Sequence, residues 1–363
     1  MDQFPYSCTI DAEPLHRYAK GGYHPILHKL GWGGYSTVWA ARDERSYKLE
    51  GTYVAVKIRV AEEDNDREHR EQDVMKKLAS IHPRSPHVMH AVDVFDLEGP
   101  NGTHRCLVFE LLGPSVPDMI DARFSDGRLP GKLAKTIAKQ VVSGLGFLHQ
   151  EKIGHGDLHT RNLAFTILSM DKVPDKEFIE TLGKPEIGHV HRSDGTQSWP
   201  LSNIIKIVDF GESFLQQTVP QTLHTPLTVR APEVIFGDHL DYRVDLWSLG
   251  CLLFKLFVGQ PPFDSFLITS KILVDQMQEM INEALPERRL GLWEAMGGGV
   301  GAESSGPGLQ EWLKDMYFDG ERREDSTGED IAKLGQIIRK LLRFEPYARA
   351  SASEILNDPW FRD

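Results

Sequence analysis

The sequence predicts an α+β fold with two lobes, in which a small antiparallel β-sheet with one helix precedes a larger α-helical lobe. Three observations lead to this prediction. Short segments rich in Val, Leu and Phe follow one another up to residue 111, as strands do. After Gly113 and Pro114 this pattern fades, and apolar residues at helical spacing dominate from residue 131 onward. The chain has 363 residues, which is enough for two structural units.

The first lobe is predicted to cover residues 23–112, after an irregular extension, residues 1–22, in which Pro and Gly interrupt any regular period. One helix is expected at 66–79, because Glu71, Met75 and Leu78 then share a face. The predicted strands are 24–31, 37–42, 53–60, 90–97 and 105–111.

The second lobe is predicted to cover residues 113–363. Its expected helices are 131–150, 243–258, 268–284, 308–317 and 330–343. Two segments look inserted. The polar stretch 171–200 is expected to form a surface loop, and the Gly- and Ser-rich residues 297–308 a flexible connection.

Composition and charge narrow the functional classes. The chain is 40% hydrophobic and 26% charged, as ordinary soluble proteins are. Its net charge of −12 argues against direct binding to nucleic acid or anionic membranes and leaves room for basic protein substrates. Three widely separated cysteines, no secretory signal and no bilayer-length apolar stretch predict an intracellular protein, in the cytoplasm or nucleus. We expect a monomer.

A glycine-rich turn lies between the first two predicted strands. Gly31 and Gly33 lack side chains there, so that backbone N–H groups can approach phosphate oxygens, and Ser36 stands where a third glycine is usual. A plain hairpin turn would look the same. Lys57, in the next Val- and Ala-rich strand, favours the phosphate interpretation, because a lysine at this position grips ATP phosphates.

Lys57 requires a carboxylate partner to hold its ammonium group in place. Glu71 is the preferred candidate, since it shares a face with Met75 and Leu78, whose burial would turn it toward the site. Glu68, one turn earlier on nearly the same face, remains the alternative.

Two further motifs carry polar groups for chemistry. Asp157 and Asn162 lie in His-Gly-Asp-Leu-His-Thr-Arg-Asn, after the predicted helix 131–150, and Asp209 opens Asp-Phe-Gly after an apolar strand. In this pattern the first aspartate accepts the proton of a substrate hydroxyl, while Asn162 and Asp209 bind Mg²⁺. Asp and Asn also occur in turns for structural reasons. The ordered combination predicts Mg²⁺-dependent transfer of the terminal phosphoryl group of ATP.

Three residues are expected to hold the second lobe together. Glu233, in Ala-Pro-Glu, is predicted to form a buried ion pair with Arg349. Asp245 opens a core helix and is expected to anchor the backbone of the loop that contains Asp157.

With these motifs, the chain resembles the eukaryotic protein kinase superfamily, and within it the SR-protein kinases. Segments 21–25, 29–39 and 107–113 carry the closer likeness, which covers about residues 15–363. The resemblance implies a two-lobed protein-kinase-like fold, ATP and Mg²⁺ as cofactors, and phosphorylation of Ser/Thr hydroxyls in proteins, including Arg/Ser-rich splicing-type proteins. It also implies a nucleotide site in which the backbone of Glu110 and Leu112 binds adenine, together with Val38, Ala55 and Leu163.

The chain departs from the family pattern at three positions in and near the catalytic loop. Gly156 replaces the arginine before the catalytic aspartate, which predicts activity that does not depend on a phosphorylated activation segment. His159 replaces a lysine, and because imidazoles lose their charge near neutral pH, turnover should be lower or pH-dependent. Arg161 is predicted to substitute in part for that lysine, as a nearby arginine does in tyrosine kinases. Pro226 replaces a threonine, which leaves the Ser/Thr or Tyr preference open.

Two other functions remain as alternatives. A weakly active pseudokinase that serves as a scaffold for nucleotide or protein partners would account for Gly156, His159 and Pro226, although Lys57 and Asp157 are intact. A small-molecule phosphotransferase has a similar catalytic loop, but it would not carry the Asp-Phe-Gly and Ala-Pro-Glu motifs.

Overall fold

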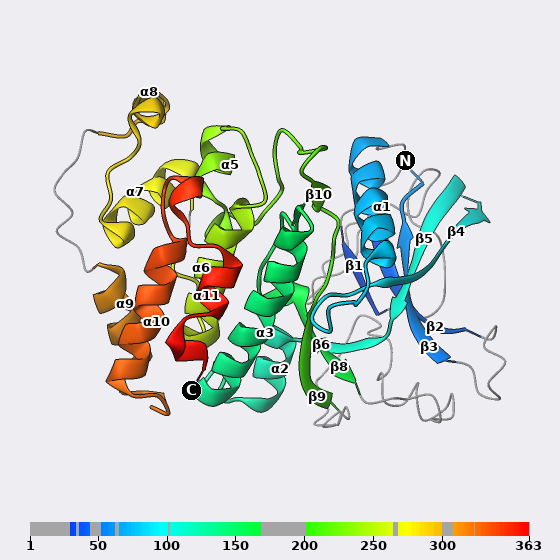
Figure 1. Cartoon of the computed structure of the whole chain (residues 1–363), viewed down its shortest axis with the longest axis horizontal. Helices are drawn as coiled ribbons and strands as arrows, with labels where there is room; N and C mark the ends of the chain where they lie inside the picture. The colour runs from blue at the N-terminus through cyan, green and yellow to red at the C-terminus, as the bar shows by residue number, and fades with distance from the viewer. Residues whose placement is uncertain are drawn as a thin grey trace, which may run out of the picture. The chain divides into compact units, whose positions relative to one another are not determined.

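The computed structural model describes residues 30–33, 36–43, 52–61, 65–100, 102–167, 201–263, 268–299, 308–322 and 324–362 (Figure 1). The predicted extension 1–22, most of the predicted strand 24–31, the insert 171–200 and most of the loop 297–308 lie outside the described residues.

The chain divides into two compact units. Unit 1 comprises Met1–Asp64, Met89–Gly113 and Thr166–Asn203, and unit 2 comprises Asn65–Val88, Pro114–Phe165 and Ile204–Asp363. The helix predicted at 66–79 therefore groups with unit 2, whereas the predicted first lobe, 23–112, includes it.

Unit 1 contains a five-stranded antiparallel sheet in the order β1-β2-β3-β5-β4. Its strands are β1 (Gly31–Gly33), β2 (Ser36–Asp43), β3 (Thr52–Arg59), β4 (Ala91–Gly99) and β5 (Gly102–Glu110). On β3, Val54, Val56 and Ile58 alternate onto one face and pack against buried Trp39 of β2. The intervening residues of β3, Lys57 among them, therefore point to the opposite face.

Unit 2 is mainly helical. Its helices are α1 (Asn65–Ser80), α2 (Val116–Arg123), α3 (Gly131–Gln150), α5 (Pro232–Phe236), α6 (Val244–Val258), α7 (Ser270–Ile281), α8 (Glu287–Ala295), α9 (Leu309–Tyr317), α10 (Gly328–Leu341) and α11 (Ala352–Leu356). Helix α6 contacts both α3 and α10, and for this reason its residues are buried almost all round (Figure 1). The core of unit 2 is centred on this helix.

Short strands and turns join these helices. They are β6 (Leu112–Ser115), β7 (Ile153–Gly154), β8 (Leu163–Ile167), β9 (Leu201–Ile207) and β10 (Phe214–Leu215), with the 3-10 turns η2 (Thr160–Asn162), η3 (Leu227–Val229), η4 (Pro346–Ala348) and η5 (Pro359–Phe361). Strands β6, β8 and β9 form a three-stranded sheet in that order, and β7 pairs with β10. None of the described helices is both long and apolar enough to cross a bilayer.

Candidate active site

The catalytic-loop residues of unit 2 converge on Asp157. Asn162, at the end of η2, directs its Nδ2 to the backbone oxygen of Asp157 at 2.9 Å and to Oδ2 at 3.2 Å. Nε2 of His159 lies 3.5 Å from Oδ1 of the same carboxylate and 3.4 Å from Nδ2 of Asn162. The Asp157 side chain is 21% exposed, so the carboxylate is held from within while a substrate can still reach it.

Asp245 fixes the backbone of this loop, as the sequence predicted. One of its oxygens accepts from the backbone N–H of His155 at 2.7 Å, and the other from that of Gly156 at 2.8 Å. His149, at the end of α3, brings Nε2 to 3.1 Å from the same carboxylate. Asp245 is 1% exposed, and charge-assisted bonds of this kind are strong in such a setting. The loop is therefore fixed to the most buried helix of unit 2.

His155 joins the loop to the segment that leads to Asp209. Its Nδ1 accepts from the backbone N–H of Asp157 at 3.2 Å, so the ring proton is on Nε2, which donates to the carbonyl of Val208 at 3.0 Å. The Val208 N–H in turn donates to the carbonyl of Asn162 at 3.0 Å. Sequence reasoning missed the roles of His149 and His155, since a single histidine carries no spacing pattern.

Asp209 has a left-handed backbone, with φ of 59°. Such values are uncommon outside glycine, although Asp and Asn tolerate them, and they occur preferentially at functional sites. The side chain is exposed, while the next residue, Phe210, is buried and packs against the ring of His155. This backbone conformation therefore lets the Asp209 carboxylate face solvent while Phe210 stays buried against His155.

The donor chemistry of Asn162 and Asp209 suits Mg²⁺. With its Nδ2 directed to Asp157, Asn162 keeps its amide oxygen for other partners, and Asp209 supplies a carboxylate. Oxygen ligands of this kind are what Mg²⁺ prefers, usually few from the protein and the rest from phosphate and water. No group of three or more His, Cys, Asp or Glu in the described ranges could hold a metal by itself.

The activation segment, residues 209–233, is tied to the catalytic loop through Gly156. This glycine has φ of 78°, and a Cβ there would lie 2.5 Å from the carbonyl oxygen of Glu212. Its own carbonyl accepts from Oγ1 of Thr225 at 2.7 Å. Glu212 is buried, and its carboxylate accepts a hydrogen bond from the backbone N–H of His224 and lies 3.2 Å from Nδ1 of that ring. Glycine at 156 thus follows from close backbone contact, which an arginine would disrupt.

The predicted residues of the nucleotide site are distributed over unit 1 and unit 2. In unit 1, Val38, Ala55 and Lys57 share a sheet face, because Val38 pairs with Lys57 across β2 and β3. Gly31 and Gly33 form β1, and Ser36 begins β2 opposite Gly33, while Glu110 ends β5 and Leu112 begins β6.

The predicted residues that belong to unit 2 are Leu163, buried at the start of β8, and Glu71, on α1. Glu71 is 1% exposed, and Met75 and Leu78, on the same helix face, are 2% and 0% exposed. This face of the helix is therefore buried, as predicted. The side chain of the alternative, Glu68, lies outside the described residues. The pairing of Lys57 with Glu71 stays a prediction.

The remaining predicted residues lie on the surface of unit 2. Arg161 is exposed on η2, directly before Asn162, and Pro226 is exposed at the start of η3.

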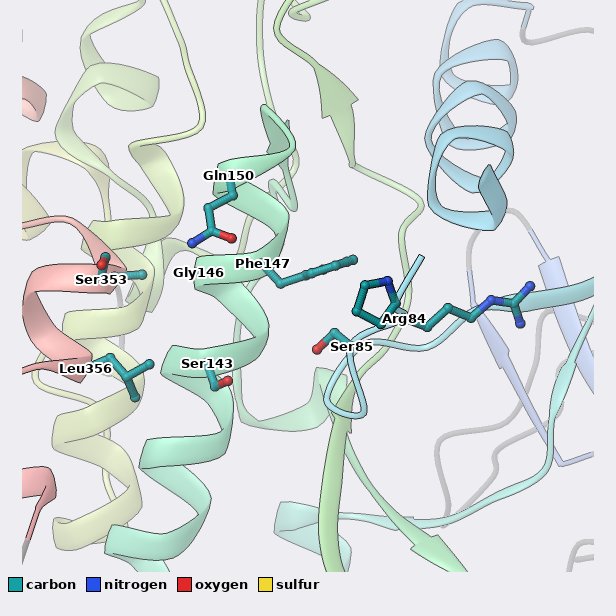
Figure 2. A pocket seen from close by; sticks show the side chains of 10 residues that line it. Arg84, Ser85, Ser143, Gly146, Phe147, Gln150, Ser353 and Leu356 are labelled. Carbon is teal, nitrogen blue, oxygen red and sulfur yellow. The ribbon is translucent and has the colours of Figure 1, made fainter. Parts of the chain in front are cut away.

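A separate pocket of about 310 Å³ lies between α3, α11 and the loop before β4, with Ser143, Phe147 and Ser353 in its wall (Figure 2). None of the predicted site residues lines it.

Comparison with known proteins gives the family. The model of the protein kinase domain matches residues 24–361, and the chain therefore belongs to the protein kinase family. A serine/threonine protein kinase of Aspergillus fumigatus is 30% identical over 97% of this chain and 90% of its own length. The serine/threonine-protein kinase SRPK of Physarum polycephalum is 29% identical, with 97% and 91% covered, and the dual specificity protein kinase CLK1 of Homo sapiens is 28% identical, with 93% and 66% covered.

These relatives confirm the resemblance predicted from the sequence, including its SR-protein kinase-like character. The protein is a serine/threonine protein kinase that transfers phosphoryl groups from ATP. The two-lobed α+β fold class is confirmed as well.

Proposed function

We propose that this kinase phosphorylates Ser and Thr residues in basic, Arg/Ser-rich proteins of the splicing type, with Mg²⁺-ATP as donor. The similarity to SRPK and CLK1 supports the substrate class, and the net charge of −12 would draw basic chains by long-range attraction. The cluster of Asp157, His159 and Asn162, fixed to α6 by Asp245, is the observation that carries the proposal.

In this proposal Asp157 accepts the proton of the substrate hydroxyl. Asn162 and Asp209 would hold Mg²⁺, which neutralises charge on the phosphate oxygens. The Gly31–Gly33 strand, Ser36 and Lys57 contact the phosphates, with Glu71 orienting Lys57. Val38, Ala55 and Leu163 enclose the adenine, which binds the backbone of Glu110 and Leu112.

His159 has two partners that require opposite hydrogen-bonding roles of its Nε2. When Nε2 carries a proton it can donate to Oδ1 of Asp157, and when it carries none it can accept from Nδ2 of Asn162. In the first case His159 donates to the Asp157 carboxylate, which is the group that must accept the substrate proton. A lysine, charged throughout, would instead supply a permanent cation beside the transferred phosphate.

The test is incubation of the protein with Mg²⁺-ATP and an Arg/Ser peptide beside a generic basic protein, with mass spectrometry of the modified residues. Asp157→Asn is the control, because it keeps the size of the side chain and removes the base. We expect phosphoserine in the Arg/Ser peptide from the wild type alone. Equal modification of both substrates would refute the Arg/Ser preference, and modification of tyrosine would refute the hydroxyl preference. The expected monomeric state and the cytoplasmic or nuclear location stay predictions.

A further inference from the structure

The activation segment and the catalytic loop of unit 2 are poor in accessible negative charge. Between Asp209 and Glu233 the activation segment contains three carboxylates. Glu233 is buried against Arg349, and Glu212 is buried and contacts His224. Asp209 is the proposed metal ligand. None of the three is therefore available to a substrate arginine.

The cations of the same surface are arranged differently. Arg230 is occupied, since its Nε and Nη2 donate to the carbonyl of Thr225 at 2.8 and 2.6 Å. Arg161, in contrast, is exposed, and within the described part of the chain it has no hydrogen-bond or ion-pair partner. In the catalytic loop, residues 153–163, the only carboxylate is that of Asp157.

Arg161 lies close to the reacting group. It precedes Asn162, whose amide contacts the Asp157 carboxylate at 3.2 Å, and both belong to the single turn η2. A peptide whose hydroxyl reaches Asp157 must place its adjoining residues beside this turn, because successive residues are only about 3.3–3.6 Å apart along an extended chain. A guanidinium there offers planar, bidentate recognition of a carboxylate or phosphate.

We propose that Arg161 determines substrate specificity by selecting acceptors with an anionic side chain two residues from the hydroxyl. In an alternating Arg/Ser sequence that position holds another serine, which becomes anionic once it is phosphorylated. The inference rests on the proposed kinase reaction and refines its substrate class. Long-range attraction brings a basic protein to the enzyme, and short-range contact with Arg161 selects the serine that has an anionic side chain two residues away. An arginine at the same position would meet like charge.

The experiment uses peptides that are identical except for one residue, placed either two positions before or two positions after the acceptor serine. That residue is Glu, Gln, Arg or phosphoserine. For the wild type we expect kcat/KM for the best Glu peptide to exceed that for its Gln counterpart about fivefold, as exposed charge-assisted pairs allow. The Arg peptide should be poorer than the Gln peptide. The phosphoserine arm tells whether a phosphate serves as well as a carboxylate.

Variants separate this role from a contact with the transferred phosphate. Arg161→Ala should abolish the preference, Arg161→Glu should reverse it in favour of the Arg peptide, and Arg161→Lys should restore part of it. If Arg161→Ala instead lowers kcat equally for all peptides and leaves their ratio unchanged, the specificity role is wrong. Lys132→Glu is the matched control. This exposed residue lies in the first turn of α3, whose 20 residues span about 30 Å before the catalytic loop, so the same charge reversal there should leave the ratio unchanged.

Binding provides a readout that does not depend on turnover. Fluorescence anisotropy of the labelled peptides should show the same order of affinities for the wild type and its reversal in Arg161→Glu. If no peptide is phosphorylated but this order and its reversal persist, the proposed kinase function fails and the specificity role stands. If neither binding nor turnover distinguishes Glu from Gln, the specificity role is overturned.

Discussion

The buried ion pair between Glu233 and Arg349 gives the sharpest prediction about stability. Both side chains are at most 1% exposed, and two parallel bonds of 2.6 Å join the guanidinium to the carboxylate. Glu233→Gln would remove the negative charge and leave Arg349 with the carbonyls of Arg343 and Arg243 as acceptors. Breaking a buried pair in this way costs about 3–5 kcal/mol, because one charge stays buried without compensation.

Thermal and urea unfolding followed by circular dichroism would measure this loss. At about 2–4 °C per kcal/mol for a unit of some 150–250 residues, Tm should fall by about 10 °C. Glu329→Gln is the matched control, since its ion pair with Lys333 is exposed and worth less than about 1 kcal/mol. Replacing both partners, Glu233→Gln with Arg349→Met, should cost less than the two single changes summed. A loss below about 1 kcal/mol for Glu233→Gln would refute the reasoning.

Three further predictions concern the site and acid stability. His159→Lys should raise turnover at pH 7.5, because lysine supplies a permanent cation there, and no gain at that pH would count against a role for positive charge at this position. Gly156→Ala should destabilise the protein by about 1–3 kcal/mol, since φ of 78° is unfavourable for a side chain and the new Cβ meets the Glu212 carbonyl; unchanged unfolding would show that the backbone can relax. Hydrogen bonds from Arg343 lower the pKa of Glu283, so its contribution to stability is present at neutral pH and is lost as the pH falls below about 4. The stability gap between wild type and Glu283→Gln should therefore close on acidification, and a constant gap from pH 7 to 3 would contradict the assignment.

Long, strongly periodic elements and family motifs were predictable from the sequence. The helix at 131–150 has the predicted bounds, and the Glu233–Arg349 pair and the Asp245 anchor are where the motifs placed them. Helix α11 was missed because five residues are too few for a period, although Ser351 and Glu354 form a capping box that could have been found.

Contacts between distant residues that no family motif marks were not predictable in this way. The bridge from His155 to Val208 and the bond from Thr225 to Gly156 join segments whose proximity depends on the whole fold. For the same reason the sequence showed Gly156 only as a replacement of the usual arginine. The structure shows that its positive φ and the nearby Glu212 carbonyl favour glycine there.

The bond between Thr225 and the Gly156 carbonyl has a consequence for how such an enzyme would be governed. A neutral hydroxyl ties the activation segment to the catalytic loop here, without an added phosphate. We therefore predict that an upstream enzyme has no covalent on-switch in this segment. Cells would then have to adjust output through the amount of the protein, its whereabouts or the supply of its targets.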